Sequence, residues 1–97
     1  MSKAYLLVYS DELGSRAEVK SIVDSIDEIT FWKFDMPNCF YILSSATSKT
    51  IATMIRTKSG VNGKFLLSEI PDNSFGWLSS ETWKIIQEKK PIYVSDE

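Results

Sequence analysis

The chain has 97 residues, which we expect to form one domain spanning 1–97. Hydrophobic residues make up 43% of it and charged residues 25%, which excludes disordered and collagen-like proteins, and the net charge of −2 argues against a general nucleic-acid binder. No apolar run approaches the roughly 20 residues that cross a bilayer, and the N-terminal residues do not resemble a secretory signal. Because the single cysteine, Cys39, cannot form an internal disulfide, we expect a cytoplasmic protein. The absence of a membrane-spanning run predicts that the protein has no membrane partner.

The chain contains no histidine. This excludes Ser-His-Asp and Cys-His catalytic pairs and, with a single cysteine, a tetrahedral zinc site. The four glycines are not spaced as in a phosphate-binding loop or a dinucleotide-binding fingerprint. Carboxylate chemistry with a hard metal remains, or no catalysis at all. We therefore expect no cofactor, with Mg or Mn only if the protein is a nuclease.

The first half of the chain predicts a strand, a helix and a hairpin. A nearly continuous apolar run is typical of a central strand, and Ser15 with Glu18 forms a capping box before residues at helical spacing. Aromatic and β-branched residues then flank a turn at 35–38. The predicted elements cover, in chain order, 4–10, 16–27, 30–34 and 39–43.

The second half predicts a helix, a strand and a further helix. An apolar stripe around Ile51 and Ile55 follows several capping residues, and Ser59-Gly60 ends that helix. Aromatic Phe75 and Trp77 are expected to pin the last helix onto the body. The remaining predicted elements are a strand over 64–70, a helix over 80–89 with Leu78, Trp83, Ile85 and Ile86 as packing residues, and a short fifth strand at 92–94.

This order predicts an α+β, ferredoxin-like βαββαβ fold with a four-stranded antiparallel sheet. The core would cover 4–70, and the C-terminal helix and tail 78–97. Both main helices would lie on one face of the sheet, so the other face needs a cover or a partner. The residues on that face are expected to be one of two alternating sets, either Tyr5, Leu7 and Tyr9 or Cys39, Tyr41 and Leu43.

Charge is unevenly distributed along the chain. Residues 36–68 carry no acidic side chain, although the protein is acidic. The stretch predicts a surface for phosphate contacts with DNA or RNA, without sequence readout. Its basic residues are Lys49, Arg56, Lys58 and Lys64.

Several segments resemble the Cas-two-like superfamily, and most closely its small branch labelled SinR-like, over roughly 4–89. The similar segments are Tyr5-Leu6-Leu7-Val8-Tyr9-Ser10-Asp11, Phe31-Trp32, the strand that ends at Glu69, and the run from Gly76 to Trp83. Relatives include nucleic-acid-binding adaptors of CRISPR adaptation, metal-dependent nucleases and VapD-type toxin ribonucleases.

The resemblance implies a homodimer in which open sheet faces meet and a C-terminal strand is added to the partner's sheet. The interface residues that we expect are Tyr5, Leu7, Tyr9, Tyr41, Ile92, Tyr93 and Val94.

The resemblance also implies a metal-binding aspartate at the end of the first strand, one from each protomer. The family pattern is Tyr-Asp, whereas this chain has Tyr9-Ser10-Asp11. If Ser10 occupies the family position, the carboxylate is replaced, because successive strand side chains point to opposite faces. A bulge would instead bring Asp11 into place as metal ligand and catalytic residue. Asp11 as a solvent-facing loop residue is the simpler interpretation.

These observations favour a small dimeric protein that acts by association, linked to nucleic acid and without efficient catalysis. One alternative is a metal-dependent endonuclease or endoribonuclease that uses Asp11 from both protomers. Another is an accessory module of a phage or mobile element that binds a larger protein complex.

Overall fold

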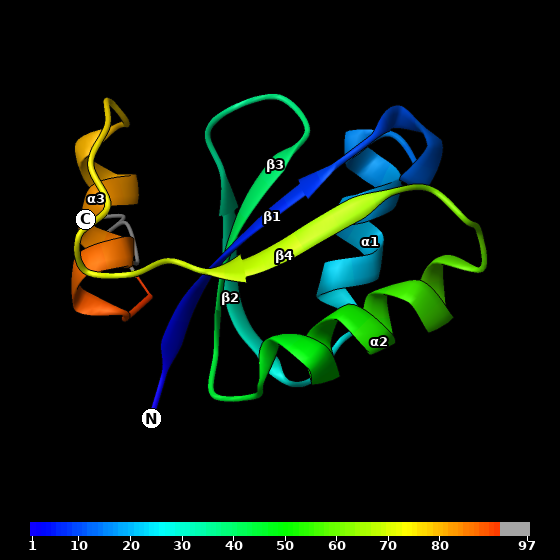
Figure 1. The fold of residues 1–97 in the computed structure, drawn as a ribbon, viewed down its shortest axis with the longest axis horizontal. Coiled ribbons are helices and arrows are strands. Elements are labelled where there is room, and N and C mark those ends of the chain that lie inside the picture. The colour runs from blue at the N-terminus through cyan, green and yellow to red at the C-terminus, as the bar shows by residue number, and fades with distance from the viewer. Residues whose placement is uncertain (92–97) are drawn as a thin grey trace, which may run out of the picture.

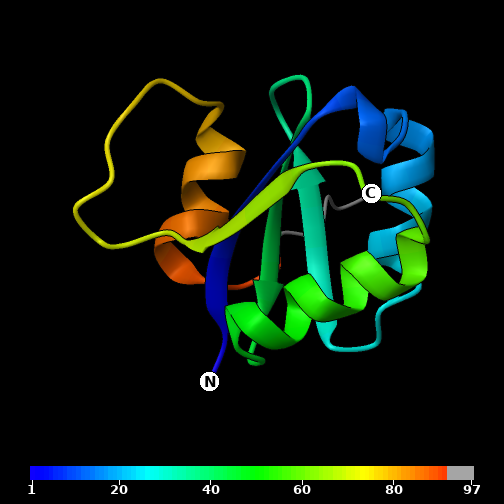
Figure 2. The ribbon, with the colours of Figure 1, turned by 45° about the vertical axis from the view of Figure 1, so that its right-hand side comes forward.

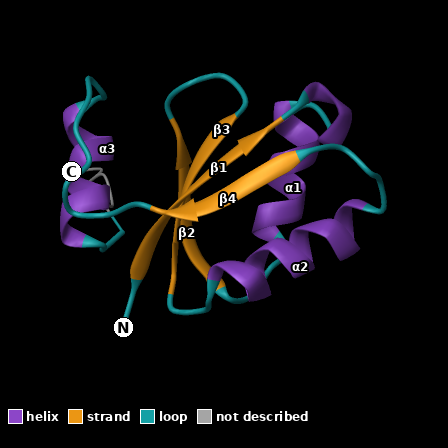
Figure 3. Ribbon diagram, viewed as in Figure 1, coloured by secondary structure: helices purple, strands orange, loops and turns teal. Residues whose placement is uncertain are grey.

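The computed structural model describes residues 1–91, and they form a four-stranded antiparallel sheet with three α-helices (Figure 1 and Figure 3). The element types and order confirm the predicted α+β fold, compatible with the ferredoxin-like βαββαβ arrangement followed by one helix. The elements are β1 (Lys3–Tyr9), a short 3-10 helix (Asp11–Leu13), α1 (Arg16–Asp24), β2 (Ile29–Phe34), β3 (Cys39–Ser44), α2 (Ser48–Ser59), β4 (Phe65–Glu69) and α3 (Ser80–Glu88).

The strand order is β2-β3-β1-β4, so β1 lies inside the sheet and β2 and β4 are its edges. Opposite β1, Val8 pairs with Cys39 of β3 and with Leu66 of β4. Because residues directly opposite each other on paired strands point to the same face of the sheet, these three side chains share one face. The β1 segment is continuously apolar because side chains on both of its faces pack, Leu7 in the principal core and Ala4 against Ile85 of α3.

The helix ends follow capping chemistry that the sequence predicts. The Ser15 hydroxyl accepts from the Glu18 amide at 3.2 Å, and the Glu18 carboxylate accepts from the Ser15 amide at 2.8 Å. Thr47, one of the residues in the predicted capping region, caps α2, and Gly60 ends it in the left-handed conformation at φ 66°. None of the helices within residues 1–91 is both long and apolar enough to cross a bilayer.

The principal core lies between the sheet and the helices α1 and α2, on the right of Figure 1. Leu7 and Phe40 from the sheet meet Val19 of α1 and Ile51 of α2, and all four side chains are fully buried. The aromatic hairpin contributes to this side, where the Trp32 and Phe40 rings lie 5.5 Å apart. The hairpin aromatics Trp32 and Phe40 therefore belong to the core.

Helix α3 lies on the opposite face of the sheet, on the left of Figure 1. Ile85 packs with Ala4 and Leu43, and Ile86 packs with Cys39 and Tyr41, in two small clusters. The connection from β4 to α3, residues 70–79, contains no helix or strand, and Figure 2 shows it as a wide loop that stands away from the sheet. The molecule therefore has three layers, of which the α3 layer is the thinnest.

Two details differ from the sequence-based expectation. Helix α1 ends at Asp24 rather than near 27, and the residues after Ser10 form a 3-10 helix where a loop was expected. The predicted strand at 92–94 lies outside the described residues.

Neighbouring residues of β1 provide a direct test of this arrangement. Leu7→Ala leaves a cavity in the principal core and is expected to lower the free energy of unfolding by about 2–5 kcal/mol. Val8→Ala, at a side chain 44% exposed on the other face, is expected to cost about 1 kcal/mol or less. Urea denaturation at one fixed, low protein concentration measures both, and equal losses would contradict the assignment of the two faces.

Candidate interaction surface

Part of the sheet face that carries α3 remains uncovered. Val8 is 44% exposed and its cross-strand neighbour Leu66 is 66% exposed. Met36, in the turn between β2 and β3, is 45% exposed on the same side. We call Val8, Met36, Leu66, Phe75 and Trp77 the apolar face. Clusters of large exposed apolar side chains mark binding surfaces more often than isolated ones do.

An apolar groove of about 320 Å³ connects the sheet to the loop that precedes α3. The sheet contributes Leu6 and Tyr41 to its lining, and α3 contributes Trp83 and Ile86. None of the described residues that line the groove is charged. Because Leu6 precedes Val8 by two residues on one strand, the groove continues the apolar face.

Phe75 and Trp77 form the outer wall of the groove and are 84% and 86% exposed. Their rings contact each other edge to face, with centroids 5.2 Å apart. The expectation that they pin α3 to the body is wrong, since that role falls to the partly buried Leu78 and Trp83. Two large aromatic side chains are therefore exposed side by side, as in an apolar patch that marks a binding site.

The structure decides between the two sets proposed for the face without α1 and α2. Cys39, Tyr41 and Leu43 lie on that face, under α3. Tyr5, Leu7 and Tyr9 face α1 and α2 and are at most 4% exposed, with the Tyr5 hydroxyl donating to the Ala46 carbonyl at 2.6 Å. Their assignment to a dimer interface is therefore corrected, because the chain itself buries them.

Tyr41 is on the expected face but is only 4% exposed, because α3 covers it. It therefore offers no surface to a second chain while α3 is in place. Ile92, Tyr93 and Val94 lie outside the described residues.

The side chains of Cys39 and Tyr41, which lie beneath α3, are buried away from solvent. Burial raises the pKa of the Cys39 thiol, and burial raises the pKa of the Tyr41 phenol above its usual value. Both side chains are therefore neutral near pH 7 and behave as packing groups. A low-pKa reactive cysteine needs the opposite surroundings, with positive charge nearby.

Asp35 holds the start of α3. Its Oδ2 atom accepts from the Ser79 amide at 3.0 Å and from the Thr82 hydroxyl at 2.9 Å. The Ser79 amide contributes most, and the Thr82 hydroxyl next, to a pKa of the Asp35 carboxyl below its usual value. The carboxylate form is therefore the form that binds the helix.

The four predicted phosphate-binding residues do not form one cluster. Lys49 and Lys58 are nine residues apart on α2, which places them on opposite sides of that helix. Lys64 follows in the loop before β4, and all three lysines are exposed. A role for these lysines in nucleic-acid binding stays a prediction.

Arg56 makes specific contacts within the chain. Its guanidinium donates to the Val61 carbonyl, and to the Gly63 carbonyl at 2.6 Å, and it lies 5.0 Å from the centre of the Phe65 ring. The loop that Arg56 binds packs tightly against the 3-10 helix. A Cβ atom at Gly63 would clash with the backbone of Glu12 and Leu13, so only glycine fits there. Arg56 therefore fastens the α2–β4 loop to α2.

The residues described do not fit a metal centre within one chain. No three histidine, cysteine, aspartate or glutamate side chains among residues 1–91 come together as a metal site. Asp11 is exposed, and its Oδ1 accepts from the Asn38 amide nitrogen at 2.9 Å. Because side chains alternate along a strand, Ser10 continues the row of Leu6 and Val8. Its hydroxyl has no hydrogen-bond partner within residues 1–91.

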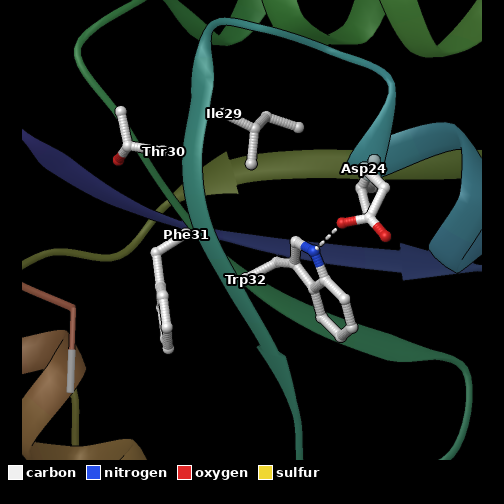
Figure 4. A pocket seen from close by; sticks show the side chains of 6 residues that line it. Asp24, Ile29, Thr30, Phe31 and Trp32 are labelled. Atoms are coloured by element: carbon white, nitrogen blue, oxygen red, sulfur yellow. Dashed lines mark hydrogen bonds between the residues drawn. The ribbon is translucent and has the colours of Figure 1, made fainter. Parts of the chain in front are cut away.

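A second hollow, of about 320 Å³, lies at the β2 edge (Figure 4). Figure 4 shows Phe31 and Trp32 pointing to opposite sides of the strand, with the Trp32 indole turned toward Asp24. The indole nitrogen donates to the Asp24 carboxylate at 2.5 Å. Asp24 is the one charged residue among the described residues that line the hollow, so its carboxylate is already hydrogen-bonded. This hollow therefore holds no pair of groups suited to acid–base catalysis.

Comparison with known proteins adds no assignment, because no family model matches the chain and neither the curated proteins nor the solved structures give a match.

The role of Arg56 can be tested by stability. Arg56→Ala removes two hydrogen bonds from a charged donor and is expected to lower the free energy of unfolding by about 1–3 kcal/mol. Lys58→Ala, an exposed neighbour on the same helix, is expected to change it by about 0.5 kcal/mol or less. Chemical denaturation compares the two variants. An Arg56→Ala variant with the wild-type free energy of unfolding would contradict the structural role of Arg56.

Proposed function

We propose that the protein works by association, and that its apolar face binds a second copy of the chain to form a homodimer. The observation that carries this proposal is the concentration of exposed apolar side chains on one side, from Val8 and Leu66 of the sheet to Trp77 of the loop. A symmetric dimer needs a surface that is complementary to itself. A protruding aromatic pair beside an apolar groove supplies both a projection and a recess.

Charge supports the same proposal. The net charge of −2 gives little repulsion between two copies, and the lining of the groove is uncharged. The resemblance to Cas-two-like proteins, whose sheet faces meet in a dimer, agrees with this mode of association. Catalysis is not part of the proposal, and the Asp11 carboxylate that the nuclease alternative would use accepts a hydrogen bond from Asn38.

A matched pair of valines tests the proposed surface. Val8 on the apolar face and Val61 in the α2–β4 loop are 44% and 43% exposed. Val8→Glu would bury an unpaired charge in the interface and is expected to raise the dimer dissociation constant at least about tenfold, a change of about 1.4 kcal/mol. Val61→Glu adds the same charge elsewhere and is expected to leave it nearly unchanged.

Sedimentation equilibrium measures both dissociation constants, and thermal unfolding by circular dichroism checks that each variant folds. Leu66→Glu, at a 66% exposed position opposite Val8, is a second variant with the same expected effect. Equal dissociation constants for the Val8 and Val61 variants would contradict the proposed surface. A wild-type protein that stays monomeric at several hundred micromolar would contradict self-association altogether.

A further inference from the structure

The β2 edge of the sheet is free along part of its length. Within residues 1–91 no strand pairs with its outer side. A bulge between Ile29 and Phe31 interrupts the pairing with β3, so the regular part of the edge runs from Phe31 to Phe34. Free strand edges of this kind are the sites at which extended peptides add to a sheet.

The backbone pairing decides which groups of β2 point outward. In an antiparallel sheet, alternate residues of a strand bond to opposite neighbours. An amide of β1 donates to the Asn38 carbonyl at 3.1 Å, so every second residue of β3 from Asn38 bonds to β1. The residues between them bond to β2, and among these Tyr41 pairs with Lys33. Lys33 therefore bonds inward, and the amides and carbonyls of Trp32 and Phe34 point to the free side.

Two cations of α1 lie over the rings of these same two residues. The Arg16 guanidinium lies 4.3 Å from the centre of the Phe34 ring, and the Lys20 ammonium lies 5.7 Å from the centre of the Trp32 ring. The rings themselves are stacked, with centres 6.5 Å apart. Both cations are exposed, and neither forms an ion pair with a side chain of residues 1–91. The free edge is therefore flanked by two positive charges at defined places.

The spacing of the cations matches the spacing of side chains on a strand. Arg16 and Lys20 are four residues apart on a helix, which corresponds to a rise of about 6 Å. Side chains that share one face of a strand are two residues, or about 6.6 Å, apart. Two such residues on an added strand, opposite Phe34 and Trp32, would face Arg16 and Lys20.

We propose that the β2 edge binds an extended segment of another protein that carries acidic side chains at alternate positions. The segment adds to the sheet as a further strand, antiparallel to β2. Its main chain bonds to Trp32 and Phe34, and its carboxylates bind Arg16 and Lys20. This proposal does not depend on the homodimer, because the dimer surface lies on the α3 face of the sheet and the two cations lie on the α1 face.

A nucleic acid fits this edge less well than a peptide does. A phosphate chain has no amide groups to donate to the outward carbonyls of Trp32 and Phe34. Three exposed carboxylates, Asp24, Asp27 and Glu28, lie at the end of α1 and before β2, where they would repel a longer polyanion. Two cations beside an acidic end favour a segment with two acidic residues.

NMR titration with two peptides of the same composition tests the site. In Thr-Thr-Glu-Val-Glu-Thr-Thr both glutamates can face α1, whereas in Thr-Thr-Glu-Glu-Val-Thr-Thr only one can. The first peptide is expected to bind at least about fivefold more tightly. N-methylation of its two glutamates keeps their charges but removes the donors that would bond to β2, and is expected to weaken binding at least about tenfold.

A matched pair of double variants separates this site from general electrostatic attraction. Arg16→Gln combined with Lys20→Gln is expected to raise the dissociation constant of the first peptide at least about tenfold. Lys49→Gln combined with Lys58→Gln removes the same charge from the exposed surface of α2 and is expected to change that constant less than about twofold. Thermal unfolding by circular dichroism checks that both variants fold.

Hydrogen exchange shows where the peptide lies. The outward amides of Trp32 and Phe34 are expected to become protected in the complex, whereas the Lys33 amide is protected without it. Equal affinity for the two peptides, equal losses in the two double variants, or no binding at millimolar peptide would overturn the proposal. An oligothymidine that binds in place of the peptide would contradict it in favour of nucleic acid. Protection of Trp32 and Phe34 that rises with protein concentration alone would assign the edge to a second copy instead.

Discussion

The alternation of side chains along β1 is the constraint on which the rest of the structure depends. Since β1 is hydrogen-bonded to β3 on one edge and to β4 on the other, it cannot shift its register without breaking both pairings. One row of its side chains, with Leu7 at its centre, closes the core beneath α1 and α2. The other row, Leu6 and Val8, meets a smaller layer that does not reach across the sheet.

The two faces of the sheet therefore differ in how completely they are covered. On the α1 and α2 side the apolar side chains are buried by the chain itself. On the α3 side, one helix with three buried residues covers β3, while Val8 and Leu66 stay in water. Because an antiparallel sheet tolerates water on one face, this arrangement is stable and still leaves apolar surface for a partner. The proposed association is a consequence of this incomplete layer.

Much of the fold could be predicted from local signals. The capping box at Ser15, the glycine end of α2 and the apolar run of β1 each specify structure through neighbours in the chain, and each prediction is confirmed. The choice between the two alternating sets could not be made, because both rows of β1 and β3 are apolar. Only the packing of α1 and α2 against one row separates them.

The site was harder to predict because it depends on contacts between distant residues. Asp35 reads as a turn residue in sequence, yet it binds Ser79 and Thr82, which lie 44 and 47 positions further on. Arg56 reads as a free basic residue, yet the loop that follows it supplies two carbonyl acceptors. Phe75 and Trp77 carry a signal in sequence, a pair of aromatics in a loop, but their exposure follows only from the wide course of 70–79.

The central claim is that the apolar face becomes buried when two chains associate. The most direct measurement is the solvent paramagnetic relaxation of side-chain methyl protons, recorded by NMR from low to high protein concentration. The account predicts that the Val8 and Leu66 methyl groups lose relaxation as concentration rises, while the equally exposed Val61 does not. Unchanged relaxation at Val8 and Leu66, in a sample whose mass doubles, would contradict the account by placing the contact elsewhere.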